Sequence, residues 1–155
     1  MSQRLDYGAA SPAGMKAMLG LQHHVENCGL EHSLLELVKT RASQINGCAY
    51  CLAMHTKDAR AAGETEQRLY LLNAWRESPF YSERERAALA WTEALTRIAD
   101  THAVSDELYA EARQHFSEKE LVDLSWAIIA INAWNRLAIP FRSEPGHYQP
   151  GDHGK

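Results

Sequence analysis

The sequence predicts an all-α protein, a compact helical bundle of about six or seven helices. Apolar residues recur at helical spacings through most of the chain, and stretches that alternate with a period of two are hard to find. Ser82 and Ser117 are each followed three positions later by a glutamate, which is the pattern of a capping box at a helix start. We therefore expect helices joined by short turns.

The first two long helices are predicted from proline, glycine and apolar spacing. Ser11 followed by Pro12 is a favourable helix start, and Gly29 stops the helix that begins there. The second helix is expected over residues 32–46, where apolar residues line one side. Gly47 then provides the left-handed cap that commonly ends a helix.

Two further helices follow in the middle of the chain. One is expected over residues 48–62 and ends at Gly63. The next begins after Thr65 and is closed by Ser78 and Pro79. These boundaries follow from local chemistry, because the residues at them favour turns over helix.

The last part of the chain contains helices over residues 82–99, after Ser105, and over residues 117–138. Pro140 is expected to end the helical part. The last helix has apolar residues over most of its circumference: Leu121, Leu124, Trp126, Ile128, Ile129, Ile131 and Trp134. Such a helix must be buried on several sides. Two alternatives remain, a central core helix or a helix buried by a second subunit.

The composition is that of one globular domain. The chain has 155 residues, of which 45% are hydrophobic and 23% charged. We assign residues 1–142 to a single domain and expect residues 143–155, rich in glycine, proline and histidine, to form a flexible tail. The net charge of −4 and the 16 scattered basic residues disfavour nucleic acid and membranes as partners. No run of 18 apolar residues occurs, so a cytoplasmic protein is expected.

The most informative stretch is the Cys-x-x-Cys of Cys48 and Cys51, followed by His55. Three cysteines are an odd number in a chain of this size, which favours reactive or metal-binding thiols over a disulfide framework. On a helix, the side chains of Cys48, Cys51 and His55 fall within an arc of about 60° that faces the apolar interior or its edge. The start of a helix stabilises negative charge and so favours thiolate, the reactive form of cysteine.

These residues are suited to redox chemistry. The spacing of Cys48 and Cys51 permits an internal disulfide. His55 lies one turn after Cys51, where it can take up the thiol proton and later protonate a leaving group. Two other interpretations stay open: His55 as a core histidine that only satisfies a hydrogen bond, and a zinc-binding or redox-sensing module that uses the same Cys and His residues.

With these residues identified, the sequence resembles the AhpD-like alkylhydroperoxidases of the carboxymuconolactone decarboxylase family, from about residue 4 to residue 142. The shared pattern is a glutamate, eleven residues, Cys-x-x-Cys, three residues and a histidine, which selects Glu36, Cys48, Cys51 and His55. The resemblance implies a thiol-dependent peroxidase that reduces alkyl hydroperoxides and assembles as a homotrimer or homohexamer. It implies no metal and no organic cofactor.

The resemblance also implies a role for each residue. Cys51 is activated through Glu36 and His55, reacts with the hydroperoxide, and is resolved by Cys48. A dithiol reductant, of lipoyl type or another thiol donor, then restores the reduced form. Some members of the family have histidine immediately before the second cysteine, where this chain has Tyr50, so Tyr50 is a secondary candidate. A γ-lactone decarboxylase, the other activity of the wider family, is a further alternative.

Helical geometry alone predicts a different position for Glu36. The residue lies about 160° from the middle of the apolar stripe of its helix, which predicts an exposed glutamate. Leu35 and Leu37 flank it, however, and a helix packed on two sides would bury Glu36 beside His55. Its catalytic role therefore rests on the resemblance.

Overall fold

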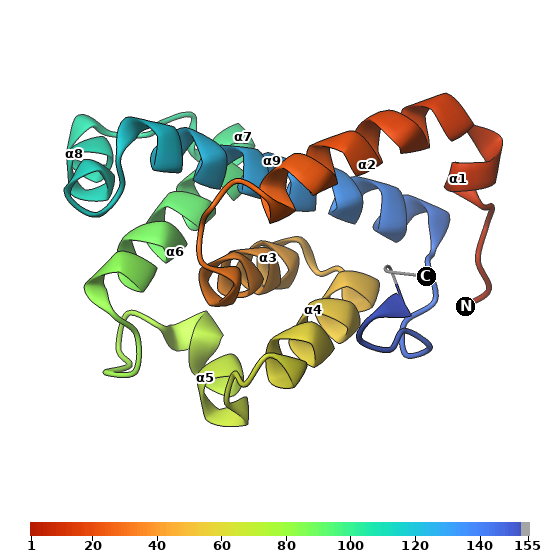
Figure 1. Ribbon diagram of the computed structural model, residues 1–155, viewed down its shortest axis with the longest axis horizontal. Helices are drawn as coiled ribbons and strands as arrows, with labels where there is room; N and C mark the ends of the chain where they lie inside the picture. The colour runs from red at the N-terminus through yellow and green to blue at the C-terminus, as the bar shows by residue number, and fades with distance from the viewer. Residues whose placement is uncertain (153–155) are drawn as a thin grey trace.

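The structure is a computed structural model that describes residues 1–152. All the regular elements within these residues are helices, which confirms the predicted all-α class (Figure 1). They are α1 Tyr7–Ala10, α2 Pro12–Glu26, α3 His32–Asn46, α4 Ala49–Ala61, α5 Glu66–Leu71, the 3-10 helix η1 Leu72–Ala74, α6 Glu83–Thr96, α7 Ile98–Thr101, α8 Asp106–His115 and α9 Glu118–Phe141.

The nine α-helices of the described residues exceed the predicted six or seven because two of them are four-residue turns. The turn α1 is capped by Asp6, whose side chain accepts from the N–H of Ala9, and it is too short to show an apolar period. The helix predicted over residues 82–99 ends at Thr96. Arg97 then leaves the helical region at φ −98° and ψ 16°, and α7 follows as a separate turn.

Helix α3 occupies the centre of the bundle and packs against α4, α6 and α9 (Figure 1). All ten residues from Leu34 to Ser43 are buried. A helix covered on one side would bury only every third or fourth residue. Its neighbours therefore enclose α3 on several sides, and polar side chains in this stretch need partners inside the protein.

The structure confirms the predicted helix caps that depend only on residues within one turn. Gly47 adopts φ 70° and ψ 35°, and its N–H donates to the carbonyl groups of Ser43 and Gln44, which confirms the left-handed cap. Both predicted capping boxes, at Ser82 and Ser117, are present with their reciprocal hydrogen bonds. These contacts fix where α3, α6 and α9 begin or end.

Helix α9 continues past Pro140, so the prediction that this proline ends the helix is wrong. The helix ends one residue later, at Phe141, and Arg142 closes it at φ 56°. Proline removes one intrahelical hydrogen bond, and in the last turn this loss affects only the fraying end of the helix. The error is therefore confined to the final turn.

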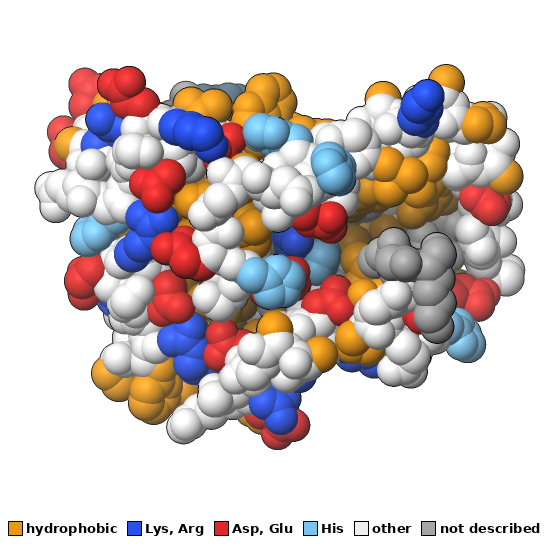
Figure 2. All heavy atoms as spheres, in the orientation of Figure 1, with side chains coloured by type: hydrophobic (Ala, Val, Ile, Leu, Met, Phe, Trp, Pro, Cys, Tyr) orange, Lys and Arg blue, Asp and Glu red, His pale blue; other side chains and the backbone are white. Residues whose placement is uncertain are grey.

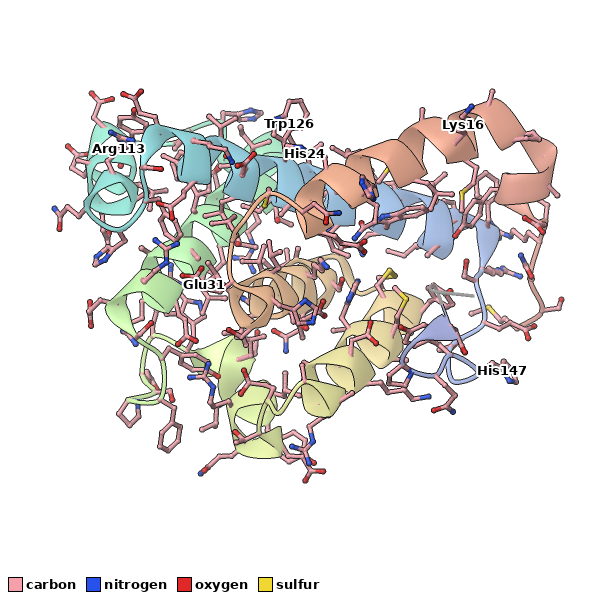
Figure 3. All side chains as sticks on the ribbon, in the orientation of Figure 1. Lys16, His24, Glu31, Arg113, Trp126 and His147 are labelled. Atoms are coloured by element: carbon pink, nitrogen blue, oxygen red, sulfur yellow. A yellow bond between two sulfur atoms is a disulfide. The ribbon has the colours of Figure 1, made fainter. Side chains whose placement is uncertain are left out.

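One side of α9 packs on the bundle, where it meets α2, α3, α4, α6 and α8. The other side exposes Val122, Trp126 and Ile129, which are 56%, 42% and 46% accessible. These residues are three and four positions apart, so they form one stripe. Figure 3 shows Trp126 on the outer side of the helix. The single chain thus buries one face of α9 and leaves an apolar stripe on the other.

The residues predicted to form the tail lie beside α4 as far as residue 152, and residues 153–155 lie outside the described part (Figure 1). The Nζ of Lys57 donates to the carbonyl groups of Gly146 and Tyr148, at 3.1 and 2.7 Å. The hydroxyl of Tyr148 donates to Oδ1 of Asp58 at 2.7 Å. These contacts hold the segment against the helix that carries the cysteines.

Acidic and basic side chains are interspersed over the face shown in Figure 2. Neither sign of charge dominates that face. No helix within residues 1–152 is both long and apolar enough to cross a membrane.

Candidate active site

The two cysteines of the motif lie at the start of α4. Cys48 is the N-cap residue, and its Sγ accepts a hydrogen bond from the backbone N–H of Cys51 at 3.3 Å. The two sulfur atoms form a disulfide, with 5.4 Å between the Cα atoms. Cysteine Cα atoms at this separation are close enough to bond without movement of the backbone. The short spacing of the motif therefore gives a pair that can be oxidised within one chain.

The disulfide is enclosed by apolar side chains. Cys48 and Cys51 are each 1% exposed. They share a buried cluster with Ala42, Ile131 and Ala138, so residues of α3 and α9 cover the start of α4. Water has little access to the sulfur atoms, and polar groups in this region act in a low-dielectric environment.

Glu36 and His55 meet beside this cluster. The Nδ1 of His55 lies 3.1 Å from Oε2 of Glu36, and the Nζ of Lys39 donates to Oε1 of the same carboxylate at 3.2 Å. Glu36 is only 3% exposed. The exposed position that helical geometry predicts for it is therefore wrong, because α3 is enclosed on more sides than the apolar stripe indicates.

The environment of Glu36 keeps its carboxylate ionised. Burial acts to raise the pKa of Glu36, but the hydrogen bond from His55 and the charge of Lys39 outweigh it and lower the pKa from its usual 4.5 to about 2. An ionised carboxylate can accept hydrogen bonds from the imidazole and the ammonium group together. The orientation of the His55 ring is thereby tied to α3.

Tyr50 is half-buried between the cysteine cluster and a hollow at the surface. The hollow has a volume of about 370 Å³ and is also lined by Asp6, Tyr7, Glu144 and His147. Burial, with a smaller contribution from Tyr7, raises the pKa of Tyr50, so its hydroxyl stays protonated at neutral pH. The residue is thus placed to offer a neutral hydroxyl or a packing surface.

Sequence reasoning missed Lys39 and Asp58. Lys39 is three residues after Glu36, a spacing that brings side chains together on a helix. Asp58 is three residues after His55 and seven after Cys51, so it shares their face of α4. These spacings were readable in the sequence, but both residues resemble ordinary surface charges there.

Glu36, His55 and Asp58 each place one potential ligand atom within 4.8 Å of the others. Among the described residues this is the one set of histidine, cysteine and acidic side chains close enough to share a cation. It does not contain the two cysteines of the zinc interpretation, whose sulfur atoms are bonded to each other.

Fold and site together define a helical dithiol protein, with a redox-capable cysteine pair at a helix start beside a buried Glu–His pair. The model of the carboxymuconolactone decarboxylase family matches residues 12–94, which is more than half of the chain. The chain belongs to the carboxymuconolactone decarboxylase family, as the resemblance predicted.

Individual relatives agree with this assignment. The chain is 48% identical over 139 residues to the uncharacterized protein YdfG of Bacillus subtilis (strain 168), covering 90% of this chain and 94% of YdfG. Among solved structures, ATU0492 of Agrobacterium tumefaciens has a TM-score of 0.90 and 47% identity, covering 95% of this chain and all of that one. ATU0492 is a protein of unknown function whose name connects it with antioxidant defence and AhpD.

A more distant structure shares the fold. The peroxidase-related protein with an alkylhydroperoxidase AhpD core from Ralstonia eutropha JMP134 has a TM-score of 0.78 and 19% identity, over 90% of this chain and 74% of that one. The AhpD-like architecture predicted from the sequence is therefore confirmed.

Proposed function

We propose that the protein is a thiol-dependent peroxidase that reduces alkyl hydroperoxides through a cycle of Cys48 and Cys51. One observation carries the proposal: the two sulfur atoms bond at the start of α4, within the same buried region as the Glu36–His55 pair. A cysteine pair that closes reversibly next to a proton carrier provides the parts that two-electron reduction of a peroxide needs.

The reaction begins from the reduced dithiol. The Cys51 thiolate attacks the terminal oxygen of the hydroperoxide, the O–O bond breaks, and the alkoxide leaves with a proton from the imidazolium of His55. Cys51 is then a sulfenic acid. The thiol of Cys48 attacks its sulfur, which closes the disulfide and releases water. A dithiol donor, of lipoyl type or another thiol, reduces the disulfide by two exchange steps and is itself oxidised.

Tyr50 indicates where the hydroperoxide enters. Its side chain packs against the cysteine cluster and also lines the hollow of about 370 Å³. Because the sulfur atoms are 1% exposed, a substrate needs a path that opens beside them. We assign entry to this hollow, with the Tyr50 side chain at its inner end.

We also propose that the protein is a cytoplasmic homotrimer or homohexamer of a single domain. The exposed stripe of Val122, Trp126 and Ile129 supports assembly, since large apolar patches on soluble proteins mark contact surfaces. Light scattering should give a mass of three or six times 17.4 kDa. Trp126→Glu should lower that mass, and a monomeric wild-type protein would contradict the assembly.

Thiol counting with intact mass spectrometry tests the peroxidase proposal. The reduced protein receives one equivalent of cumene hydroperoxide, and we expect a mass loss of two hydrogen atoms, loss of two free thiols and release of one equivalent of alcohol. The Cys28→Ser variant, which removes the remaining free cysteine, should react identically. A reduced protein that leaves the hydroperoxide unchanged would overturn the proposal.

The same protein preparation tests the alternatives. Stoichiometric zinc in protein purified without added metal, together with protected thiols, would favour the zinc-binding module. Disulfide formation without turnover by any dithiol donor would favour a redox sensor. Conversion of a γ-lactone carboxylate by the Cys48→Ser, Cys51→Ser double variant would favour a decarboxylase, because that activity would not need the dithiol.

A further inference from the structure

Asp58 links the site to a distant part of the chain. Its Oδ1 accepts a hydrogen bond of 2.7 Å from the hydroxyl of Tyr148, a residue 90 positions further along. The neighbouring Lys57 holds the backbone of the same segment through the carbonyl groups of Gly146 and Tyr148. The segment is therefore attached to α4 by its main chain and by the Tyr148 side chain at once.

The position of Asp58 on α4 brings it to His55. Asp58 follows His55 by three residues on the same face of the helix, one turn further from the cysteines. One atom from each of Glu36, His55 and Asp58 lies within 4.8 Å of the others. The imidazole therefore has a second carboxylate close to it, in addition to the one that its Nδ1 contacts.

The two carboxylates are held in different ways. Glu36 is fully enclosed and bonded to both His55 and Lys39. Asp58 is half-buried and is held by the hydroxyl of Tyr148. Burial, followed by the hydrogen bond to Asp58, raises the pKa of Tyr148 far above its usual value. The hydroxyl therefore keeps its proton and remains a donor over the whole physiological range.

We propose that Asp58 acts on His55 as a second carboxylate and that Tyr148 is the residue that positions it. The inference rests on the proposed peroxidase function, because it explains how His55 is kept ready to protonate the leaving alkoxide. Neither residue contacts the reacting atoms in this assignment. Both are positioning residues that act through the imidazole.

The charges around His55 give the direction of the effect. Glu36 and Lys39 approach from α3, Cys51 and Asp58 lie on α4, and Tyr148 lies in the C-terminal segment. The residues of α9 in this cluster, Ile131 and Ala138, are apolar. The carboxylates of Glu36 and Asp58 therefore both lie close to the ring. The inference assigns to Asp58 the effect that a nearby carboxylate has on an imidazole, which is to favour the protonated ring.

The test measures the protonation of His55 directly and needs no peroxide. Ring ¹⁵N chemical shifts of the reduced full-length protein give the ratio of imidazolium to imidazole at one fixed pH near 7. We expect Asp58→Asn to lower this ratio about tenfold, since a charge at this range commonly changes such an equilibrium by a factor of ten or more. Tyr148→Phe should lower it by about two- to threefold, because the ring and the Lys57 contacts remain while the carboxylate loses its anchor.

A double-mutant cycle decides whether Tyr148 acts through Asp58. Tyr148→Phe should have no further effect in the Asp58→Asn background. Asp58→Glu should restore most of the ratio if Asp58→Asn lowers it through lost charge. Tyr109→Phe is the matched control: this tyrosine is 49% exposed on α8 and packs near Trp91, so the ratio should not change.

Two results would overturn the inference. An unchanged ratio in Asp58→Asn would show that Asp58 does not act on His55. An effect of Tyr148→Phe that persists in the Asp58→Asn background would show that Tyr148 does not act through Asp58. Should Asp58→Asn fail to fold, the ratio in Tyr148→Phe tests the inference, because this variant loses only one hydroxyl group and should still fold. An unchanged ratio in Tyr148→Phe would then overturn it. Failure of the proposed function is seen separately, as hydroperoxide that the reduced wild-type protein does not consume.

Discussion

His55 and Glu36 come from different helices, yet the Nδ1 of His55 lies 3.1 Å from Oε2 of Glu36. Both side chains are more than nine-tenths buried. A buried carboxylate needs hydrogen-bond donors inside the protein, and His55 and Lys39 supply them. The pair therefore ties the chemistry of α4 to the packing of α3.

Replacing Glu36 tests this connection. Glu36→Gln keeps the shape of the side chain but removes the charged carboxylate that holds the His55 ring. We expect kcat/KM for cumene hydroperoxide to fall by about 100-fold, the scale of a lost general acid. Glu31→Gln, at an exposed glutamate paired with Arg84, should keep the wild-type rate. Equal rates in Glu36→Gln and Glu31→Gln would show that the charge of Glu36 has no part in the reaction.

Glu36 also makes stability depend on pH in acid. Burial raises its pKa, but His55 and Lys39 lower it to about 2, below the usual 4.5. The folded protein therefore binds fewer protons at this site, and the ionised carboxylate stabilises the fold above about pH 4.5, an effect lost as the pH falls toward 2. Urea denaturation at several pH values should show a shallower fall in the free energy of unfolding for Glu36→Gln than for wild type. A slope as steep as that of wild type would contradict an ionised Glu36.

The two cysteines should have different mutant phenotypes. Cys51→Ser removes the attacking sulfur, so hydroperoxide consumption should stop. Cys48→Ser should consume one equivalent and then stall with Cys51 as a sulfenic acid or a mixed disulfide, which a dimedone adduct and intact mass would detect. Normal turnover of Cys48→Ser with a dithiol donor would mean that Cys48 is not the resolving residue.

Gly47 fixes the turn between Glu36 on α3 and the cysteines on α4. At φ 70°, a Cβ would meet no neighbour within 4 Å, so the cost of Gly47→Ala comes from the backbone alone and should be about 1 kcal/mol of unfolding free energy. Gly20→Ala is the control, since Gly20 lies inside α2 with equal space around it and should gain up to about 1 kcal/mol. Urea denaturation measures both, and a gain at Gly47 would contradict the left-handed cap.

Local signals in the sequence predicted most of the fold. The capping boxes at Ser82 and Ser117 and the cap at Gly47 depend on residues within one turn, so they were readable without tertiary structure. The arrangement of the cysteines on one helix is local in the same sense. The single turn α1 was missed because four residues are too few to show a period.

The rest of the site depends on packing between distant segments. The apolar stripe of α3 packs on residues of α6 and α9, and Glu36 is buried because α4, which carries His55, lies against another side of the helix. Helical geometry alone does not reveal this second contact. The bond between Asp58 and Tyr148 joins residues 90 positions apart and leaves no pattern in either segment. Only the resemblance to a known family pointed to Glu36 in advance.

The enclosure of α3 has a consequence for how this protein can vary. In an amphipathic helix such as α2, where Val25 is the one buried residue, a library of all single substitutions should find many tolerant positions. Along residues 34–43 such a library should instead find that substitutions at every position are poorly tolerated, because every side chain there is buried. A substitution in this segment then requires compensating substitutions in the helices that surround it.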